Sequence, residues 1–188
     1  WRLANALAKN RKPLAAIEVA YGELALEATE RHRLVVVGAS ERVWVDGVAY
    51  PARTAVTVEP GSSIRIAGPA YGARTIVAVE GGFKGQARLG SVCGTVLSRD
   101  HRLDAPNSRS IDGPVRLALD DGAVAPWLED GPIRIVAGPH HRWFPSGLDG
   151  TTFTVNAVSD RMGIRLDGPD PGQSEDLASF PVPFGSIQ

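Results

Sequence analysis

Four charged side chains gather within residues 159–168, which read SDRMGIRLDG. Side chains of a strand alternate between its faces, so a strand here would place Arg161 and Arg165 on one face, roughly 13 Å apart, with Gly163 between them. Two guanidinium groups beside a small residue could bind a carboxylate or a phosphoryl oxygen. Asp160 would start the strand, where it could orient Arg161 or accept a proton as a general base.

A second interpretation of the same pattern is a strand with one solvated face. The alternation of apolar side chains with arginine also occurs in Ile64-Arg65-Ile66 and in Ile133-Arg134-Ile135. Such alternation is typical of a half-buried strand whether or not its polar face binds anything. The residue types alone leave both interpretations open.

Other candidate groups favour no further chemistry. Adjacent histidines in a strand point to opposite faces, and His140 and His141 have no acid or cysteine at metal-ligand spacing, so no metal site is predicted. Residues 81–85 lack the serine or threonine that follows the lysine of a phosphate-binding loop. No nucleotide site is recognisable. Cys93 has no neighbour that would activate its thiol, and we expect it to be buried and inert.

Bulk composition excludes several classes of function. The net charge of the 188-residue chain is −1, so no overall field would attract nucleic acid or an anionic membrane. A single cysteine rules out an intrachain disulfide and fits a reducing compartment, which predicts a cytoplasmic protein. No apolar run approaches the length of a transmembrane helix. The length allows one domain or two small ones.

The remaining signals predict an all-β barrel or sandwich behind a short N-terminal helix. Residues 1–10 read as the end of a helix that Asn10 could cap, and residues 34–37 as a strand buried on both faces. Residues 43–50 form the clearest hairpin, because Asp46-Gly47 suits a type I′ turn. We expect further strands at 17–19, 23–27, 64–66, 75–79, 133–136, 152–155 and 162–166. The turn-rich stretch after residue 99 divides the chain into a first subdomain (1–112), a linker (113–132) and a second subdomain (133–188).

Several segments, in order along the chain, resemble one family. They are Arg2-Leu3-Ala4-Asn5, Ala16-Ile17-Glu18-Val19, Val79-Glu80-Gly81-Gly82-Phe83, Leu89-Gly90-Ser91, Ile135-Val136-Ala137-Gly138-Pro139, the SDRMG segment, Ser174-Glu175 and Gly185-Ser186-Ile187-Gln188. The chain resembles the allophanate hydrolase subunit 2 family, which includes the KipI antagonist KipA, the C-type subunit of bacterial 5-oxoprolinase and a carboxyltransferase domain of urea carboxylase. The SDRMG segment is the most specific of these matches.

The resemblance implies cyclophilin-like β-barrel subdomains and an activity shared with other subunits. A KipI-like subunit would bind beside this chain, and a LamB/YcsF-like subunit would join them. The complex would use ATP to open 5-oxoproline to glutamate, with no cofactor bound by this chain itself. A second reading is a carboxyltransferase module that takes carboxybiotin from a separate protein and acts on urea. A third is a non-catalytic protein that sequesters a KipI-like regulator.

The resemblance also assigns roles to single residues. It implies that Asp160 and Arg161 are catalytic, and that Glu18, Ser159, Arg165 and Gln188 bind the substrate. The arginines would hold a carboxylate or stabilise a developing oxyanion, and the two acids would pair with them or accept protons. The family has further segments before and after those seen here, so we expect these residues to be part of a longer protein, and whether they act alone stays open.

Overall fold

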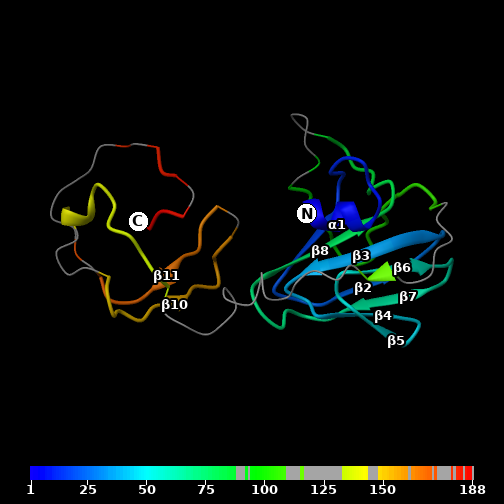
Figure 1. Cartoon of the computed structure of the whole chain (residues 1–188), viewed down its shortest axis with the longest axis horizontal. Coiled ribbons are helices and arrows are strands. Elements are labelled where there is room, and N and C mark those ends of the chain that lie inside the picture. Colours follow the sequence, from blue (N-terminus) through cyan, green and yellow to red (C-terminus); the bar gives the residue numbers. More distant parts are fainter. Residues whose placement is uncertain are drawn as a thin grey trace. The chain divides into compact units, whose positions relative to one another are not determined.

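The computed structural model describes residues 1–87, 92, 94–108, 115–116, 133–143, 148–160, 162–170, 172, 179, 181–183 and 185–187. The chain divides into two compact units, Trp1–Asp130 and Gly131–Gln188. Both units are drawn in Figure 1. The predicted linker, 113–132, falls almost entirely outside the described residues, so the proposed subdomain boundaries stay a prediction. Cys93 also lies outside them, and its expected burial stays a prediction too.

Two antiparallel sheets form the first unit (Figure 1). One sheet contains, in spatial order, β1 (Ile17–Ala20), β8 (Arg74–Val79), β3 (His32–Gly38), β6 (Thr54–Val58) and β9 (Val115–Arg116). The other contains β2 (Leu24–Glu27), β7 (Ser63–Ile66), β4 (Arg42–Val45) and β5 (Val48–Pro51). The predicted strands at 17–19, 23–27, 64–66 and 75–79 are therefore confirmed.

The central strand β3 is buried on both faces, as its continuous apolar run predicts. Leu34 and Val36 pack into the core between the two sheets, whereas Val35 and Val37 pack toward the helix α1 (Arg2–Leu7). Figure 1 shows α1 lying over β8 and β3. The core between the sheets consists of Ile17, Ala28, Leu34, Val36, Val43, Val45, Val56, Val58, Ile64, Ile66, Val77 and Val79. The five-stranded sheet is thus the middle layer of the unit.

The N-terminal helix is confirmed, and Asn10 helps to close its C-terminus through its backbone, because the Asn10 N–H donates to the Asn5 carbonyl at 2.9 Å. Ala4, Leu7 and Ala8 are buried against the sheet. Lys9 rather than Asn10 adopts the left-handed conformation after the helix, with φ of 63°. The Lys9 N–H donates to the Ala6 carbonyl at 3.0 Å, so the two backbone bonds form a Schellman-type helix end, while the side chain of Asn10 bonds to groups of the helix and of β8.

The β4–β5 hairpin has the predicted turn. Asp46 and Gly47 have φ of 50° and 82°, as a type I′ turn requires. The Asp46 carboxylate also accepts a hydrogen bond from the Ser63 backbone at 2.8 Å, which ties the turn to β7. On the outer face, the Arg65 guanidinium lies 3.7 Å from the centre of the Trp44 ring. The alternation at 64–66 therefore marks a strand whose arginine is on the solvent side.

The second unit has much less regular structure in its described part. It contains one short hairpin, β10 (Thr154–Val155) with β11 (Leu166–Asp167), and a 3₁₀ turn, η3 (His141–Trp143). The predicted strand at 133–136 was wrong, because these residues form no ladder and are exposed. The expected strand at 152–155 is confirmed only at its last two residues. Of the expected strand at 162–166, only Leu166 lies in a strand, because the residues before it form a hydrogen-bonded loop.

The predicted fold class is confirmed: apart from the short N-terminal helix α1 and the 3₁₀ turn η3, the regular structure of the described residues is antiparallel β. Among the described residues, no helix has both the length and the apolar character needed to cross a lipid bilayer.

Candidate functional site

The loop that joins β10 to β11 is described at residues 156–160 and 162–165. The Asp160 carboxylate accepts hydrogen bonds from the backbone N–H groups of Met162, at 2.8 Å, and Gly163, at 3.2 Å. The Asp160 backbone N–H in turn donates to the Gly163 carbonyl at 3.1 Å. A short acidic side chain that bonds the backbone two residues ahead stabilises a tight turn. Asp160 therefore shapes the tip of the loop.

Ser159 closes the loop from the other side. Its hydroxyl oxygen accepts the Arg165 backbone N–H at 2.9 Å and lies 3.2 Å from the Arg165 carbonyl. Arg165 takes part in these bonds through its backbone, and the residue is exposed. The structure thus brings three of the predicted site residues, Ser159, Asp160 and Arg165, into one loop.

These hydrogen bonds explain why the expected strand at 162–166 does not form. Asp160 and Ser159 bond to the backbone groups that a longer ladder would need, so the chain turns at Met162 and Gly163 instead of extending. The predicted strand was therefore wrong for residues 162–165. Arg161 and Gln188 lie outside the described residues, and their assigned roles stay predictions.

Glu18 belongs to the first unit, on β1. Its carboxylate forms an ion pair with the Arg74 guanidinium at 3.1 Å, across the β1–β8 ladder. The Arg74 guanidinium lies 5.6 Å from the centre of the Tyr21 ring. This ion pair joins Glu18 to a strand neighbour, and its predicted role in substrate binding stays a prediction.

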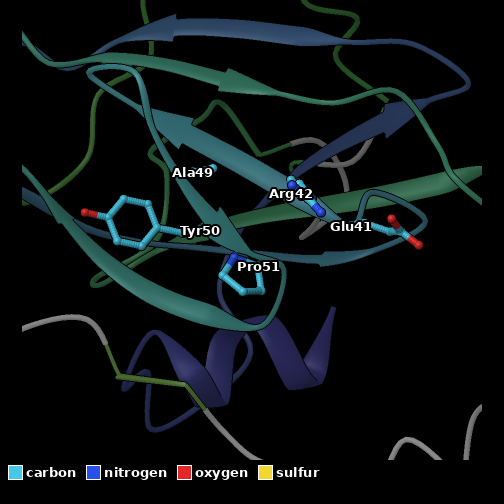
Figure 2. Close-up of a pocket in the computed structure, with 5 residues that line it drawn as sticks. All are labelled: Glu41, Arg42, Ala49, Tyr50 and Pro51. Carbon is cyan, nitrogen blue, oxygen red and sulfur yellow. The ribbon is translucent and has the colours of Figure 1, made fainter.

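An open hollow of about 400 Å³ lies at the β4–β5 hairpin, lined by Glu41, Arg42, Ala49, Tyr50 and Pro51. In Figure 2 the side chains of Tyr50 and Glu41 extend in opposite directions. Of the predicted site residues that the structure describes (Glu18, Ser159, Asp160 and Arg165), none lines this hollow. No group of three or more histidine, cysteine, aspartate or glutamate side chains suited to a metal occurs among the residues that the structure describes. The β10–β11 loop therefore remains the candidate site.

The comparisons with known proteins agree with this architecture. The family model "carboxyltransferase domain, subdomain A and B" matches residues 1–188. The chain belongs to this family. No curated protein matches it in sequence.

Solved structures resemble this carboxyltransferase domain over nearly all of its length. TTHA0988 aligns with 100% of the chain at 25% identity and a TM-score of 0.74. The Kluyveromyces lactis urea amidolyase and urea carboxylase each align with 93% of it at 19% identity, with TM-scores of 0.68 and 0.67. The chain spans only 38% of TTHA0988 and 12% and 18% of the two Kluyveromyces lactis proteins.

Two of the segments that resemble the family meet in the structure of this carboxyltransferase domain. Asn5, 1% exposed, accepts hydrogen bonds from Leu14 N–H at 3.0 Å and from the Asn10 amide at 2.8 Å. Asn10 also donates to the Val79 carbonyl at 2.9 Å and accepts the Gly81 N–H at 2.8 Å. The sequence did not point to this network, because Leu14 and Asn10 lie in a loop whose residue types do not show which groups they bond. The first of these segments and the Gly-Gly segment therefore serve the fold.

Packing explains why residue 168, at the end of the stretch 159–168, is a glycine. A Cβ atom there would meet the Phe153 ring, with the Cε1 atom at 2.8 Å. We expect Gly168→Ala to destabilise the β10–β11 hairpin by about 1–3 kcal/mol, because the ring cannot stay where it is. Hydrogen exchange of peptides spanning 150–170 in the full-length protein measures this. Gly138→Ala is the control, since a Cβ there meets nothing within 4 Å; equal exchange in both variants would contradict the packing argument.

Proposed function

We propose that this carboxyltransferase domain moves a carboxyl group from carboxybiotin, carried by a separate protein, to the nitrogen of a urea-like amide. The observation that carries this proposal is the family match over residues 1–188. The names of two structural neighbours, urea amidolyase and urea carboxylase, support it. These findings favour carboxyl transfer over the ATP-dependent opening of 5-oxoproline.

The reaction sets clear demands on the site. The bond between the carboxyl carbon and the biotin ureido nitrogen breaks, and a bond from that carbon to the acceptor nitrogen forms. A proton passes from the acceptor nitrogen to the ureido nitrogen, so atoms and charge balance. Negative charge develops on oxygen during the transfer, and fixed guanidinium groups stabilise such charge.

The loop at 156–165 supplies groups of this kind. In this proposal Arg161 and Arg165 donate hydrogen bonds to the oxygens of the carboxyl group and of the acceptor amide. In this proposal Asp160 and Ser159 hold the loop in shape, because their side-chain oxygens accept backbone hydrogen bonds within it. Glu18 and Gln188 remain candidates for contacts with the acceptor.

The direct test uses the full-length protein that contains this chain. A biotinylated carrier is charged with labelled bicarbonate by biotin carboxylase and ATP, then freed of ATP. We expect label to move to urea only when the full-length protein is added. A second arm supplies 5-oxoproline and ATP together with the KipI-like and LamB/YcsF-like subunits. Release of glutamate there, with no transfer to urea, would overturn the proposal in favour of lactam opening.

Arg161→Ala tests the assigned chemistry. We expect kcat/KM for carboxyl transfer to fall about 100-fold, the usual cost of losing one stabilising donor at a developing oxyanion. The control is Arg134→Ala, which removes an exposed arginine elsewhere in the second unit; we expect about a 2-fold change at most. Equal losses in both variants would remove Arg161 from the site.

Binding of the KipI-like protein separates this reading from a purely sequestering role. Arg161→Ala is expected to leave co-purification with that protein unchanged while transfer is lost. A wild-type protein that binds the KipI-like protein but transfers nothing would favour the non-catalytic reading.

A further inference from the structure

We propose that Asn156 is a positioning residue for this reaction: it clasps the base of the β10–β11 loop and so fixes where the loop presents its arginines. The inference rests on the proposed function, because it assumes that this loop acts on the substrate. Asn156 lies outside the most specific segment, and neither its type nor its spacing singles it out in the sequence.

Asn156 bonds across the base of the loop with both its side chain and its backbone. Its amide nitrogen lies 3.0 and 2.9 Å from the two carboxylate oxygens of Asp167 and donates to them. Its side-chain oxygen accepts the Val158 N–H at 2.9 Å. Its backbone N–H donates to the Arg165 carbonyl at 2.8 Å, and its carbonyl accepts the Ser159 N–H at 3.0 Å.

These contacts matter because the ladder that carries the loop is very short. The strands β10 and β11 have two residues each, and both are exposed. A hairpin with so short a ladder is marginal in water unless side chains brace it. Asn156 joins the start of the loop to Arg165 and to β11. Ser159 and Asp160 then shape the tip beyond that clasp.

Loss of the clasp would therefore loosen the loop without removing a charged group. The carboxylate of Asp167 would lose the amide that faces it, and the Val158 N–H would lose its acceptor. An arginine displaced by even about 1 Å stabilises a developing charge far less well. Because the lost stabilisation acts in the transition state of the transfer step, we expect Asn156→Ala to lower kcat and to leave KM nearly unchanged.

Three variants of the full-length protein separate this role from others. Asn156→Ala removes the clasp. The double variant Asn156→Asp/Asp167→Asn exchanges the two side chains, so that an amide at 167 faces a carboxylate at 156 and the Val158 N–H keeps an acceptor. The matched control is Asp170→Ala, which removes a similar local bond, from the Gly172 N–H to the Asp170 carboxylate at 2.8 Å, outside the loop.

Two measurements are made on each variant. The first is amide hydrogen exchange of peptides that cover residues 157–166, which reports the loop whatever the protein does. We expect hydrogen exchange to be about 10-fold faster in Asn156→Ala. In the double variant Asn156→Asp/Asp167→Asn and in the control Asp170→Ala, we expect it to be close to wild type. The second is the labelled-carboxyl transfer assay. We expect Asn156→Ala to lower kcat about 10-fold while KM stays within about 2-fold of wild type, and the double variant to recover most of the lost kcat.

The outcomes are distinguishable. Unchanged exchange in Asn156→Ala would overturn the clasp, whatever the transfer assay gives. Faster exchange with wild-type kcat would overturn the positioning role. A wild-type protein that transfers no label would instead overturn the proposed function, and the exchange data would still decide whether Asn156 holds the loop.

Discussion

Replacing Gly38 with alanine is expected to lower the free energy of unfolding of the first unit by about 4 kcal/mol, close to the margin by which a domain is stable. Gly38 ends β3 with φ of 112°, a conformation that residues with a Cβ rarely adopt. The added Cβ would also meet the Arg74 carbonyl oxygen and lie 3.1 Å from the Thr75 Cα atom. Backbone atoms of a paired strand cannot move aside easily.

The displacement would reach further contacts. The Arg74 carbonyl accepts the Ala39 N–H at 2.8 Å, and the Thr75 hydroxyl accepts the Ser40 N–H at 2.9 Å. Both bonds hold the residues that directly follow β3 against β8. Arg74 also pairs with Glu18, so we expect that ion pair to shift as well.

Urea denaturation of the full-length protein measures this effect against a matched variant. Gly47 also has a positive φ, 82°, but a Cβ added there would meet nothing within 4 Å. Gly47→Ala therefore introduces the backbone strain without a steric clash. We expect it to cost about 1–2 kcal/mol. Equal costs for the two variants would mean that the close approach of Arg74 is unimportant.

The second large effect is expected for Asn5→Ala, at about 2–4 kcal/mol of unfolding free energy. The Asn5 amide donates to the carbonyls of Trp1, at 3.2 Å, and Leu14, at 3.1 Å. Its oxygen is the acceptor for Leu14 N–H and for Asn10. Alanine would leave the Leu14 N–H without this bond at a half-buried position, which adds to the cost of the lost bond itself.

A double-mutant cycle with Asn10→Ala tests the network. Because the two side chains bond each other at 2.8 Å, their effects should be non-additive by about 0.5–3 kcal/mol. Asn107→Ala, at an exposed position of the same unit, is the control and should change stability by no more than about 0.5 kcal/mol. Additive losses, or a loss in the control as large as that of Asn5→Ala, would rule out a specific network.

The first unit was predictable from sequence because its signals are local or periodic. The run at 34–37 marks a strand buried on both faces, and Asp46-Gly47 marks the hairpin turn; both predictions are confirmed. A strand in a middle layer is covered on both faces, and β3 shows this as a continuous apolar run at 34–37. The role of Asn10 was not predictable, because its partners at Val79 and Gly81 are about seventy residues away.

The second unit shows where periodicity fails. Residues 133–136 alternate like a strand but pair with nothing described, since a strand needs a partner that its own sequence does not specify. In the SDRMG segment, local bonds from Ser159 and Asp160 to the backbone compete with a ladder and prevail. The residue types of the candidate site were visible in the sequence, but the loop that holds them was not.

The order of strand pairing in the first unit has a consequence for synthesis on the ribosome. β1 pairs with β8 and β2 with β7, so the two earliest strands join strands made much later, with Ile17 opposite Val77. At a translation rate of about 5–20 residues per second, the chain needs several seconds to make the partner of β1. During that interval the apolar residues of β1 and β2 have no sheet to enter. We therefore expect nascent chains stalled before β8 to bind chaperones, and those stalled well beyond it to be released.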